Sequence, residues 1–324
     1  MIYLLNHLKA PLRGLFTLQR RFERNFLVMD KIIRCITSDG AVMASAIDAS
    51  DIVFTAKKLH NLSRCGTAAL GRLLCAASIM GAMLKQKDAF VNLTVKGGGE
   101  LGAVVAVADS KGNVRGYVDN PECPTEYYDN GKINVAKAVG TDGMLTVMRD
   151  YGSGEPYVGQ VELVSGEIAE DVTNYYATSE QIPSACALGV LINKEDGEVM
   201  LAGGLLIQLL PGADDAVIDK IEKNVAKLEP VTTMLAKGMS ILDICKTALD
   251  GFEVEVLDEF PVNYVCTCSK EKLERYFCTL ADDEVRSLED DNGEVEAVCH
   301  FCNKKYVFTS DDIEKLIESK HKKD

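Results

Sequence analysis

Two close pairs of cysteines stand near the C-terminal end of this 324-residue chain and have the spacing of a metal site. Cys266 and Cys268 form the first pair, and Cys299 and Cys302 follow after the 30 residues 269–298. Each pair can span one edge of a tetrahedron of thiolates around zinc, in which a Zn–S bond is about 2.3 Å long. We therefore predict one zinc ion per chain bound by these four side chains. Two neighbours, His300 and Cys278, are the alternative ligands.

The second pair also has the Cys-x-x-Cys spacing of a redox centre. A thioredoxin-like pair lies where a strand meets a helix, because the helix N-terminus lowers the pKa of the thiol. The residues that follow Cys302, NKKYVF, instead have the pattern of a strand. Spacing alone therefore favours a structural zinc ribbon.

A zinc site of four thiolates is nevertheless able to act as a switch. Thiolates that bind zinc remain nucleophilic, and their oxidation releases the metal together with the folding free energy that it supplies. This free energy is about 10–16 kcal/mol in zinc peptides, and a segment of about 60 residues has little core to replace it. We expect such a domain to be folded when reduced and metallated, and unfolded when oxidised.

Three glycines, Gly97, Gly99 and Gly102, have the spacing of a dinucleotide-binding fingerprint. In that fingerprint a helix follows the glycines, and its N-terminus holds the pyrophosphate. Here the strand-like residues AVVAVADS follow instead. We therefore predict a glycine-rich hairpin and no bound nucleotide.

The remaining cysteines have no metal-site spacing. Most occupy apolar contexts that are typical of small core residues: Cys35, Cys65, Cys75, Cys186 and Cys245. Cys123 lies between a glutamate and a proline, so we predict that it is exposed and reactive.

The composition is that of a soluble, acidic chain, with 47% hydrophobic residues, 26% charged residues and a net charge of -14. This charge disfavours binding to nucleic acid, which requires clustered basic residues. Eleven unevenly spaced cysteines do not suit a secreted disulfide framework, so we expect a reducing, cytoplasmic location. The apolar residues 73–84 are too few to cross a bilayer, and we expect no membrane partner.

Residues 1–28 differ from the rest because they contain five basic residues and one acidic residue. An arginine-rich amphipathic leader is typical of an organellar transit peptide, whereas a secretory signal requires a longer apolar core. The alternative is a misassigned start, with translation beginning at Met29. The fold is expected to begin at that methionine in either case.

Residues 29–210 have the pattern of an α+β core domain with an antiparallel sheet and a buried helix. Asp39 and Gly40 predict the turn of a β-hairpin. The apolar residues 61–85 predict the buried helix, and the glycine-rich residues 89–120 predict a three-stranded antiparallel meander. The other expected elements are helices over 50–60 and 167–180 and strands over 144–149, 157–164 and 199–210.

Residues 211–259 contain short helices without a strand between them. One apolar stripe includes Val217 and Ile221, and a second helix begins with a Ser240 and Asp243 capping box. We predict a helical linker whose apolar faces dock on a neighbouring domain. An ordinary helical end of the core domain is the alternative. Residues 260–324 would then form the small zinc-binding domain.

The combined motifs resemble one family, the heat shock protein 33 family of 33 kDa chaperonins. The shared segments are CTC, CHFCNKKYVF, TAALGRLLCAASIMGAMLK, GGGELGAVVAVADSKGNVRGYVDNP, GQVELVSGEIAEDVTNYYATSEQIPSA and AGGLLIQLLPGA. The resemblance extends from Met29 to near Tyr306. Residues 1–28 and Cys278 depart from the family pattern.

The resemblance implies a redox-regulated holdase and not an enzyme. It implies that zinc on the four cysteines accompanies the inactive, reduced state. Peroxide or hypochlorite would release the metal and pair Cys266 with Cys268 and Cys299 with Cys302. The oxidised protein would lose the fold of its zinc domain, form a homodimer and bind unfolding client proteins without nucleotide. A zinc-ribbon interaction module and a thiol-disulfide oxidoreductase remain the alternatives.

Overall fold

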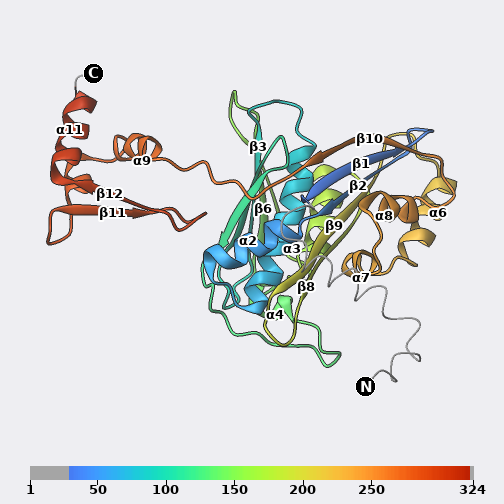
Figure 1. The fold of residues 1–324 in the computed structure, drawn as a ribbon. Helices are drawn as coiled ribbons and strands as arrows, with labels where there is room; N and C mark the ends of the chain where they lie inside the picture. The colour runs from blue at the N-terminus through green and yellow to red at the C-terminus, as the bar shows by residue number, and fades with distance from the viewer. Residues whose placement is uncertain (1–28, 322–324) are drawn as a thin grey trace. The chain divides into compact units, whose positions relative to one another are not determined.

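The computed structural model describes residues 29–321, so the prediction of a leader or misassigned start at residues 1–28 lies outside the described residues. The chain divides into two compact units (Figure 1). The division falls between Tyr264 and Val265. The first unit contains two five-stranded antiparallel sheets, and the second contains a two-stranded antiparallel sheet. The predicted α+β fold class is confirmed.

One sheet of the first unit has the strand order β10-β1-β2-β9-β8. Its strands are β1 (Lys31–Thr37), β2 (Val42–Asp48), β8 (Ser184–Ile192), β9 (Val199–Leu209) and β10 (Val254–Pro261). The predicted hairpin joins β1 and β2, and Gly40 in its turn has a φ of 72°, which glycine adopts without steric cost. The two edge strands, β8 and β10, are not predicted from the sequence.

The other sheet has the order β5-β4-β3-β6-β7. Its strands are β3 (Phe90–Lys96), β4 (Val104–Asp109), β5 (Val114–Val118), β6 (Met144–Asp150) and β7 (Tyr157–Glu162). The predicted meander is confirmed as β3, β4 and β5. A Cβ atom on Gly97 would lie 2.3 Å from the carbonyl oxygen of Gly140, at the end of α4 (Val135–Val139). The glycines before β4 thus permit a close approach of two backbone segments.

A central helix, α3 (Arg64–Ala82), lies between the two sheets, with α2 (Ser50–His60) before it (Figure 1). Nearly all of its 19 residues are buried, as predicted. Gly71 faces Val190 of β8, and Gly81 faces Ala108 of β4. Within residues 29–321, α3 is the one helix long and apolar enough to span a membrane, but 94% of its apolar window is buried inside the fold. Such burial is typical of a core helix.

The predicted helix over 167–180 is α5 (Ala169–Tyr175), which continues as a π-helical turn, Tyr176–Glu180. Its first turn is organised by Asp171, whose side chain is fully buried. One carboxylate oxygen of Asp171 accepts the backbone N–H groups of three residues, Val164, Ser165 and Gly166. The other oxygen accepts the N–H of Ile168 at 2.9 Å and holds this residue at a φ of 70°, which is rare for a β-branched side chain.

We expect Asp171→Ala to lower the free energy of unfolding of the first unit by about 3–5 kcal/mol, because four backbone N–H groups would lose their acceptor, and those of Gly166 and Ile168 are buried. Urea denaturation followed by tyrosine fluorescence measures this change. The matched control is Glu170→Ala, which truncates the exposed neighbouring carboxylate. Equal midpoints for the two variants would contradict the structural role of Asp171.

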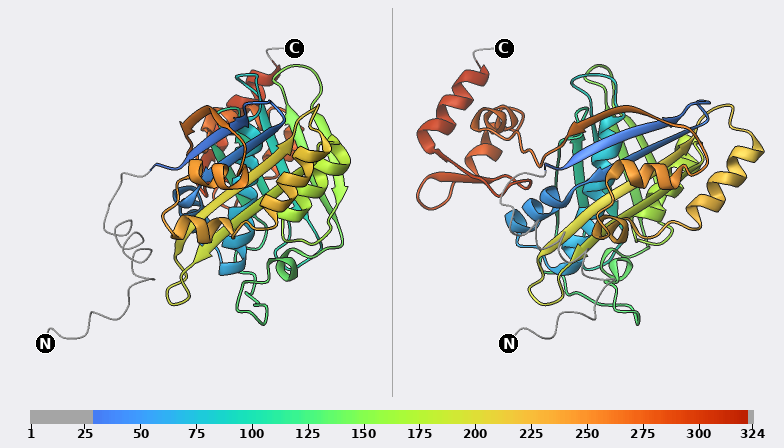
Figure 2. Two further views of the ribbon diagram at one scale, coloured as in Figure 1. Left: turned by 90° about the vertical axis from the view of Figure 1, so that its right-hand side faces the viewer. Right: turned by 45° about the vertical axis from the view of Figure 1, so that its right-hand side comes forward.

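Residues 211–253 form α6 (Asp215–Val225), α7 (Val231–Ala236) and α8 (Ile241–Ala248), which lie across the sheet that contains β1 (Figure 2). Ile32 of β1 packs in the cluster around α3, while its neighbour Ile33 packs in the cluster with α8. Since successive side chains of a strand point to opposite faces, these helices cover the face opposite α3. The predicted capping box of Ser240 and Asp243 begins α8.

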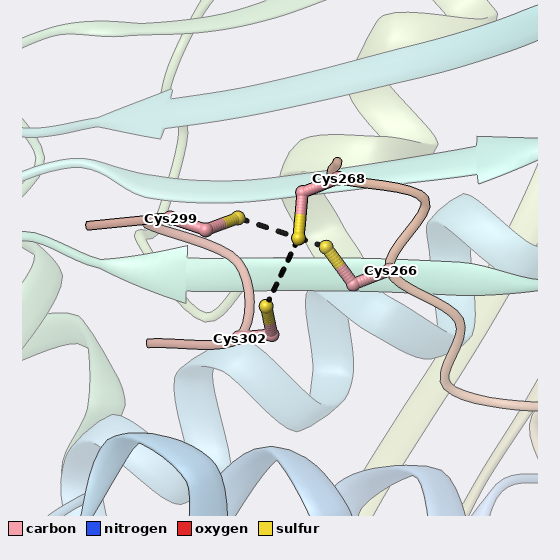
Figure 3. A group of neighbouring side chains, drawn as sticks. All are labelled: Cys266, Cys268, Cys299 and Cys302. Atoms are coloured by element: carbon pink, nitrogen blue, oxygen red, sulfur yellow. Dashed lines mark hydrogen bonds between the residues drawn. The ribbon is translucent and has the colours of Figure 1, made fainter. Parts of the chain in front are cut away.

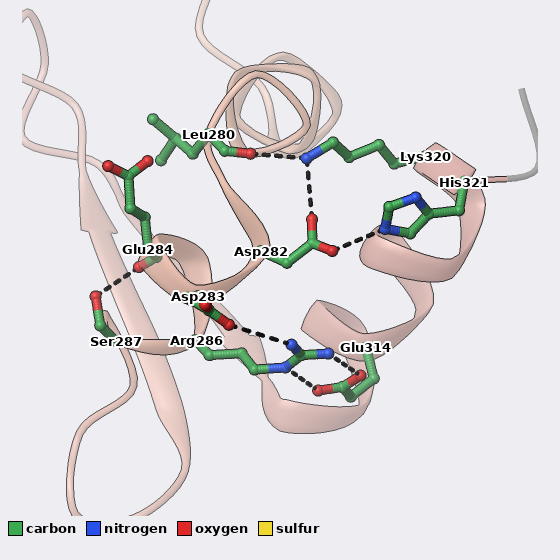
Figure 4. Close-up of polar contacts among 9 residues, drawn as sticks. All are labelled: Leu280, Asp282, Asp283, Glu284, Arg286, Ser287, Glu314, Lys320 and His321. Carbon is green, nitrogen blue, oxygen red and sulfur yellow. Dashed lines mark hydrogen bonds and ion pairs between the residues drawn. The ribbon is translucent and has the colours of Figure 1, made fainter. Parts of the chain in front are cut away.

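The second unit packs its helices around a small hairpin. Its elements are α9 (Lys270–Phe277), α10 (Asp282–Arg286), β11 (Glu294–Val298), β12 (Lys305–Thr309) and α11 (Ser310–His321). Its core contains the buried side chains of Phe277, Val285, Val295, Tyr306, Phe308, Ile313 and Ile317. At the surface, Arg286 of α10 forms a bidentate ion pair with Glu314 of α11 (Figure 4). The carboxylate of Asp282 forms hydrogen bonds with the side chains of Lys320 and His321.

Candidate metal centre

The four cysteines with metal-site spacing meet in the second unit (Figure 3). Cys266 and Cys268 lie in the extended segment between β10 and α9, and Cys299 and Cys302 lie in the turn between β11 and β12. The sulfurs of Cys266 and Cys268 both point toward those of the other pair (Figure 3). Two segments that are distant in sequence thus gather four thiols.

The turn between β11 and β12 has the hydrogen bonds of a tight knuckle. The carbonyl oxygen of Cys299 accepts the N–H groups of Cys302 at 3.3 Å and Asn303 at 2.8 Å. Asn303 has a φ of 55°, and asparagine tolerates this left-handed conformation better than most residues. The predicted strand after the turn is confirmed as β12. The next element after Cys302 is this strand and not a helix, so the turn differs from a thioredoxin-like junction.

The geometry and chemistry of the four sulfurs fit a zinc ion. All four Sγ atoms lie within 4.8 Å of one another. The Sγ atoms of Cys266 and Cys299 are 3.6 Å apart, and those of Cys268 and Cys302 are 3.4 Å apart. Four thiolates at about 2.3 Å from a tetrahedral zinc would be separated by about 3.8 Å, whereas a disulfide requires about 2.05 Å. The arrangement is therefore that of four free thiols spaced for a metal.

A tyrosine that is not predicted from the sequence also contacts these thiols. Tyr306 of β12 is 8% exposed, and its hydroxyl donates a hydrogen bond of 3.1 Å to the Sγ of Cys268. Partial burial opposes ionisation, but the hydrogen bonds from Tyr306 and the other thiols lower the pKa of Cys268 to about 7. Partial burial raises the pKa of Cys266 and of Cys302. Without metal, Cys268 thus becomes a thiolate more readily than Cys266 or Cys302.

We expect Tyr306→Phe to weaken zinc binding about 10–100-fold, the usual effect of removing a hydrogen bond to a ligand atom. The phenylalanine ring would preserve the apolar packing, so the change isolates the hydroxyl. Competition with a chromophoric chelator measures the affinity. The control is Tyr276→Phe on α9, where the side chain is exposed. Equal affinities of the two variants would show that the Tyr306 hydroxyl does not stabilise the site.

The other candidate residues are not members of this group of four. Neither His300 nor Cys278 belongs to the set of neighbouring metal-binding side chains found among residues 29–321. The prediction for Cys123 is wrong, because the side chain is 1% exposed. It turns inward beside Cys65, whose Sγ lies 3.2 Å from the Cys123 carbonyl oxygen. Burial also raises the pKa of Cys123, to about 12, so this thiol is poorly reactive.

Comparison with known proteins gives consistent matches over most of the chain. A family model described as Hsp33 protein matches residues 30–309. A 33 kDa chaperonin of Bacillus licheniformis is 44% identical over 290 residues, which cover 89% of this chain and 99% of that protein. A 33 kDa chaperonin of Clostridioides difficile is also 44% identical, over 89% of this chain and 99% of its own length.

Among solved structures, the crystal structure of the 33 kDa chaperonin of Thermotoga maritima is similar to this chain with a TM-score of 0.81. The two are 34% identical, and the alignment covers 91% of this chain and 100% of the other. The similarity therefore includes both the sequence and the fold.

Proposed function

Because this chain belongs to the Hsp33 family of chaperones, we propose that it is a redox-regulated holdase that binds unfolding proteins and prevents their aggregation. Its partners would be client proteins and, in the oxidised state, a second copy of the chain. We propose a cytoplasmic location and no catalytic activity. The observation that supports this proposal most directly is the group of four free thiols in a unit with a small core.

In the proposed reduced state, Cys266, Cys268, Cys299 and Cys302 hold one zinc ion. When bound, zinc keeps the four thiolates deprotonated and gathered. Two contacts between sulfurs, of 3.4 and 3.6 Å, each join a cysteine of the first pair to one of the second. These contacts do not determine which sulfurs form disulfides on oxidation. We propose the pairs implied by the family, Cys266 with Cys268 and Cys299 with Cys302.

Each proposed disulfide consumes one peroxide molecule. A thiolate attacks one peroxide oxygen, the O–O bond breaks, and a sulfenic acid forms. The second thiol of the pair then displaces the hydroxyl as water and forms the S–S bond. Two sulfurs are oxidised, and one peroxide is reduced to two water molecules. Sulfurs joined within each pair can no longer serve as four separate thiolate ligands.

The proposed activation then proceeds along the chain. The second unit begins at Val265, and residues 262–264 separate it from β10, which pairs with β1 and follows α8. Loss of the fold after Val265 would leave residues 262–264 as the anchor of that end of β10, and we propose that this weakens the edge pairing of β10 and the docking of α8. The face beneath α8 is apolar and includes Ile33 and Ala46, so its exposure would provide a surface for unfolded clients.

The proposal is tested by measuring zinc per chain and the aggregation of a heat-denaturing client before and after peroxide. We expect one zinc per chain and no protection before oxidation, and zinc loss with protection after it. Oxidised protein that keeps its zinc, or that loses zinc without protecting the client, would contradict the switch. Turnover of small disulfides by the reduced protein would instead indicate an oxidoreductase.

A further inference from the structure

Two cysteines outside the candidate metal centre meet between α8 and the sheet that it covers. Cys35 lies on β1 directly opposite Ala44 of β2. The Sγ of Cys245, in α8, lies 4.0 Å from the carbonyl oxygen of the same Ala44. Both cysteine side chains are fully buried in one apolar cluster, and each lies near enough to the other to shift its pKa. A strand and a helix far apart in sequence thus present thiols to each other.

The two thiols differ in acidity. The interaction between the two thiols lowers the pKa of Cys35 and raises the pKa of Cys245, and burial raises the pKa of Cys245 further. The nearby charged side chains that affect Cys35 are Lys246, Glu259 and Asp258. Since the thiolate is the reactive form, Cys35 is the nucleophile of this pair and Cys245 the thiol that resolves the first product.

We propose that Cys35 and Cys245 form a disulfide during strong oxidation, and that this bond links α8 covalently to β1. The thiolate of Cys35 attacks hydrogen peroxide, the O–O bond breaks, and the products are a sulfenic acid and hydroxide, which takes up the proton released by the thiol. The sulfur of Cys245 then attacks the sulfenic sulfur, and the hydroxyl leaves as water with the Cys245 proton. Two electrons pass from the two sulfurs to one peroxide, which becomes two water molecules.

Burial determines when this bond forms. Both thiols have 0% exposure, whereas the four thiols of the second unit are partly exposed. The oxidant therefore reaches the four-thiol group first, and the bond between Cys35 and Cys245 requires a local opening around α8. The regulatory effect of this bond rests on the proposed function. An α8 helix that is covalently linked to β1 cannot leave the sheet, so prolonged oxidation would limit the binding of clients.

The pairing is tested on the full-length wild-type protein by peptide mass mapping over a time course of peroxide treatment. After unfolding and alkylation, trypsin releases residues 35–57 and residues 238–246, each with one cysteine. We expect these two peptides to become disulfide-linked after the four thiols of the second unit have been oxidised. Their recovery as separate alkylated peptides, or linked to other cysteines, at the end of a prolonged treatment that continues well after those four thiols are oxidised would overturn the proposal.

The locking effect is tested with Cys35→Ala, and Cys278→Ala is the matched control that removes a cysteine outside the pair. We expect both variants to release zinc as the wild type does, and only Cys35→Ala to keep full client holding during prolonged oxidation. Equal decline in all three proteins, despite the linked peptide in the wild type, would overturn the locking effect. Failure of zinc release or of holding in every protein would contradict the proposed function instead, while the linked peptide still decides the pairing.

Discussion

Replacement of Cys268 by serine is expected to abolish zinc binding and to unfold the second unit, while the core of the first unit around α3 stays folded. The second unit has a small core, and zinc in such a domain supplies about 10–16 kcal/mol of folding free energy. The substitution removes one of four ligands and also the acceptor of the Tyr306 hydrogen bond. Metal analysis of the purified protein and hydrogen exchange over residues 265–321 measure the two effects.

The control for this prediction is Cys278→Ser, the same change at a partly buried cysteine of the same unit. It should keep one zinc per chain and the protection of residues 265–321. Retention of zinc by the Cys268 variant would show that Cys278 or His300 serves as a ligand in its place. Zinc loss without unfolding would instead show that the core around Phe308 is sufficient to stabilise the second unit.

The gathering of the four thiols is predictable from the sequence because each pair is local and only a few residue types bind zinc. The contribution of Tyr306 is not, since it depends on the position of β12 beside the segment that carries Cys268. The alternation in KYVF does place Tyr306 and Phe308 on one side of a strand, and both are buried. That pattern indicates a core face, but it does not indicate which sulfur the hydroxyl reaches.

Two strands, β8 and β10, are not predicted from the sequence, and the reasons differ. The residues of β8, SACALGVLI, form an apolar run without alternation, which does not distinguish a strand from a buried helix. The residues of β10, VEVLDEFP, contain acidic groups and form a strand by pairing with β1, more than two hundred positions earlier. The prediction that Cys123 is exposed is wrong because it rests on the neighbours in sequence. Those polar neighbours do not indicate that the side chain turns inward toward Cys65.

Ile244→Lys is expected to make the reduced, zinc-bound protein hold clients without any oxidant. Ile244 has no exposed surface, and α8 is held to the sheet by this side chain and a few buried neighbours. Loss of a buried isoleucine side chain destabilises the docked position of α8 by about 2–5 kcal/mol. Burial of an unpaired ammonium group would destabilise it further, so α8 should leave the sheet. Hydrogen exchange over residues 241–248 and suppression of client aggregation measure undocking and activity.

The matched control is Thr247→Lys, which places the same charge on the exposed side of α8, four residues after Asp243. This variant should keep α8 protected and the reduced protein inactive. If Ile244→Lys exposes residues 241–248 to exchange and the protein still fails to protect a client, undocking of α8 is not the activating step. The client surface would then have to arise from the unfolded second unit itself, and the disulfide between Cys35 and Cys245 would leave holding unchanged.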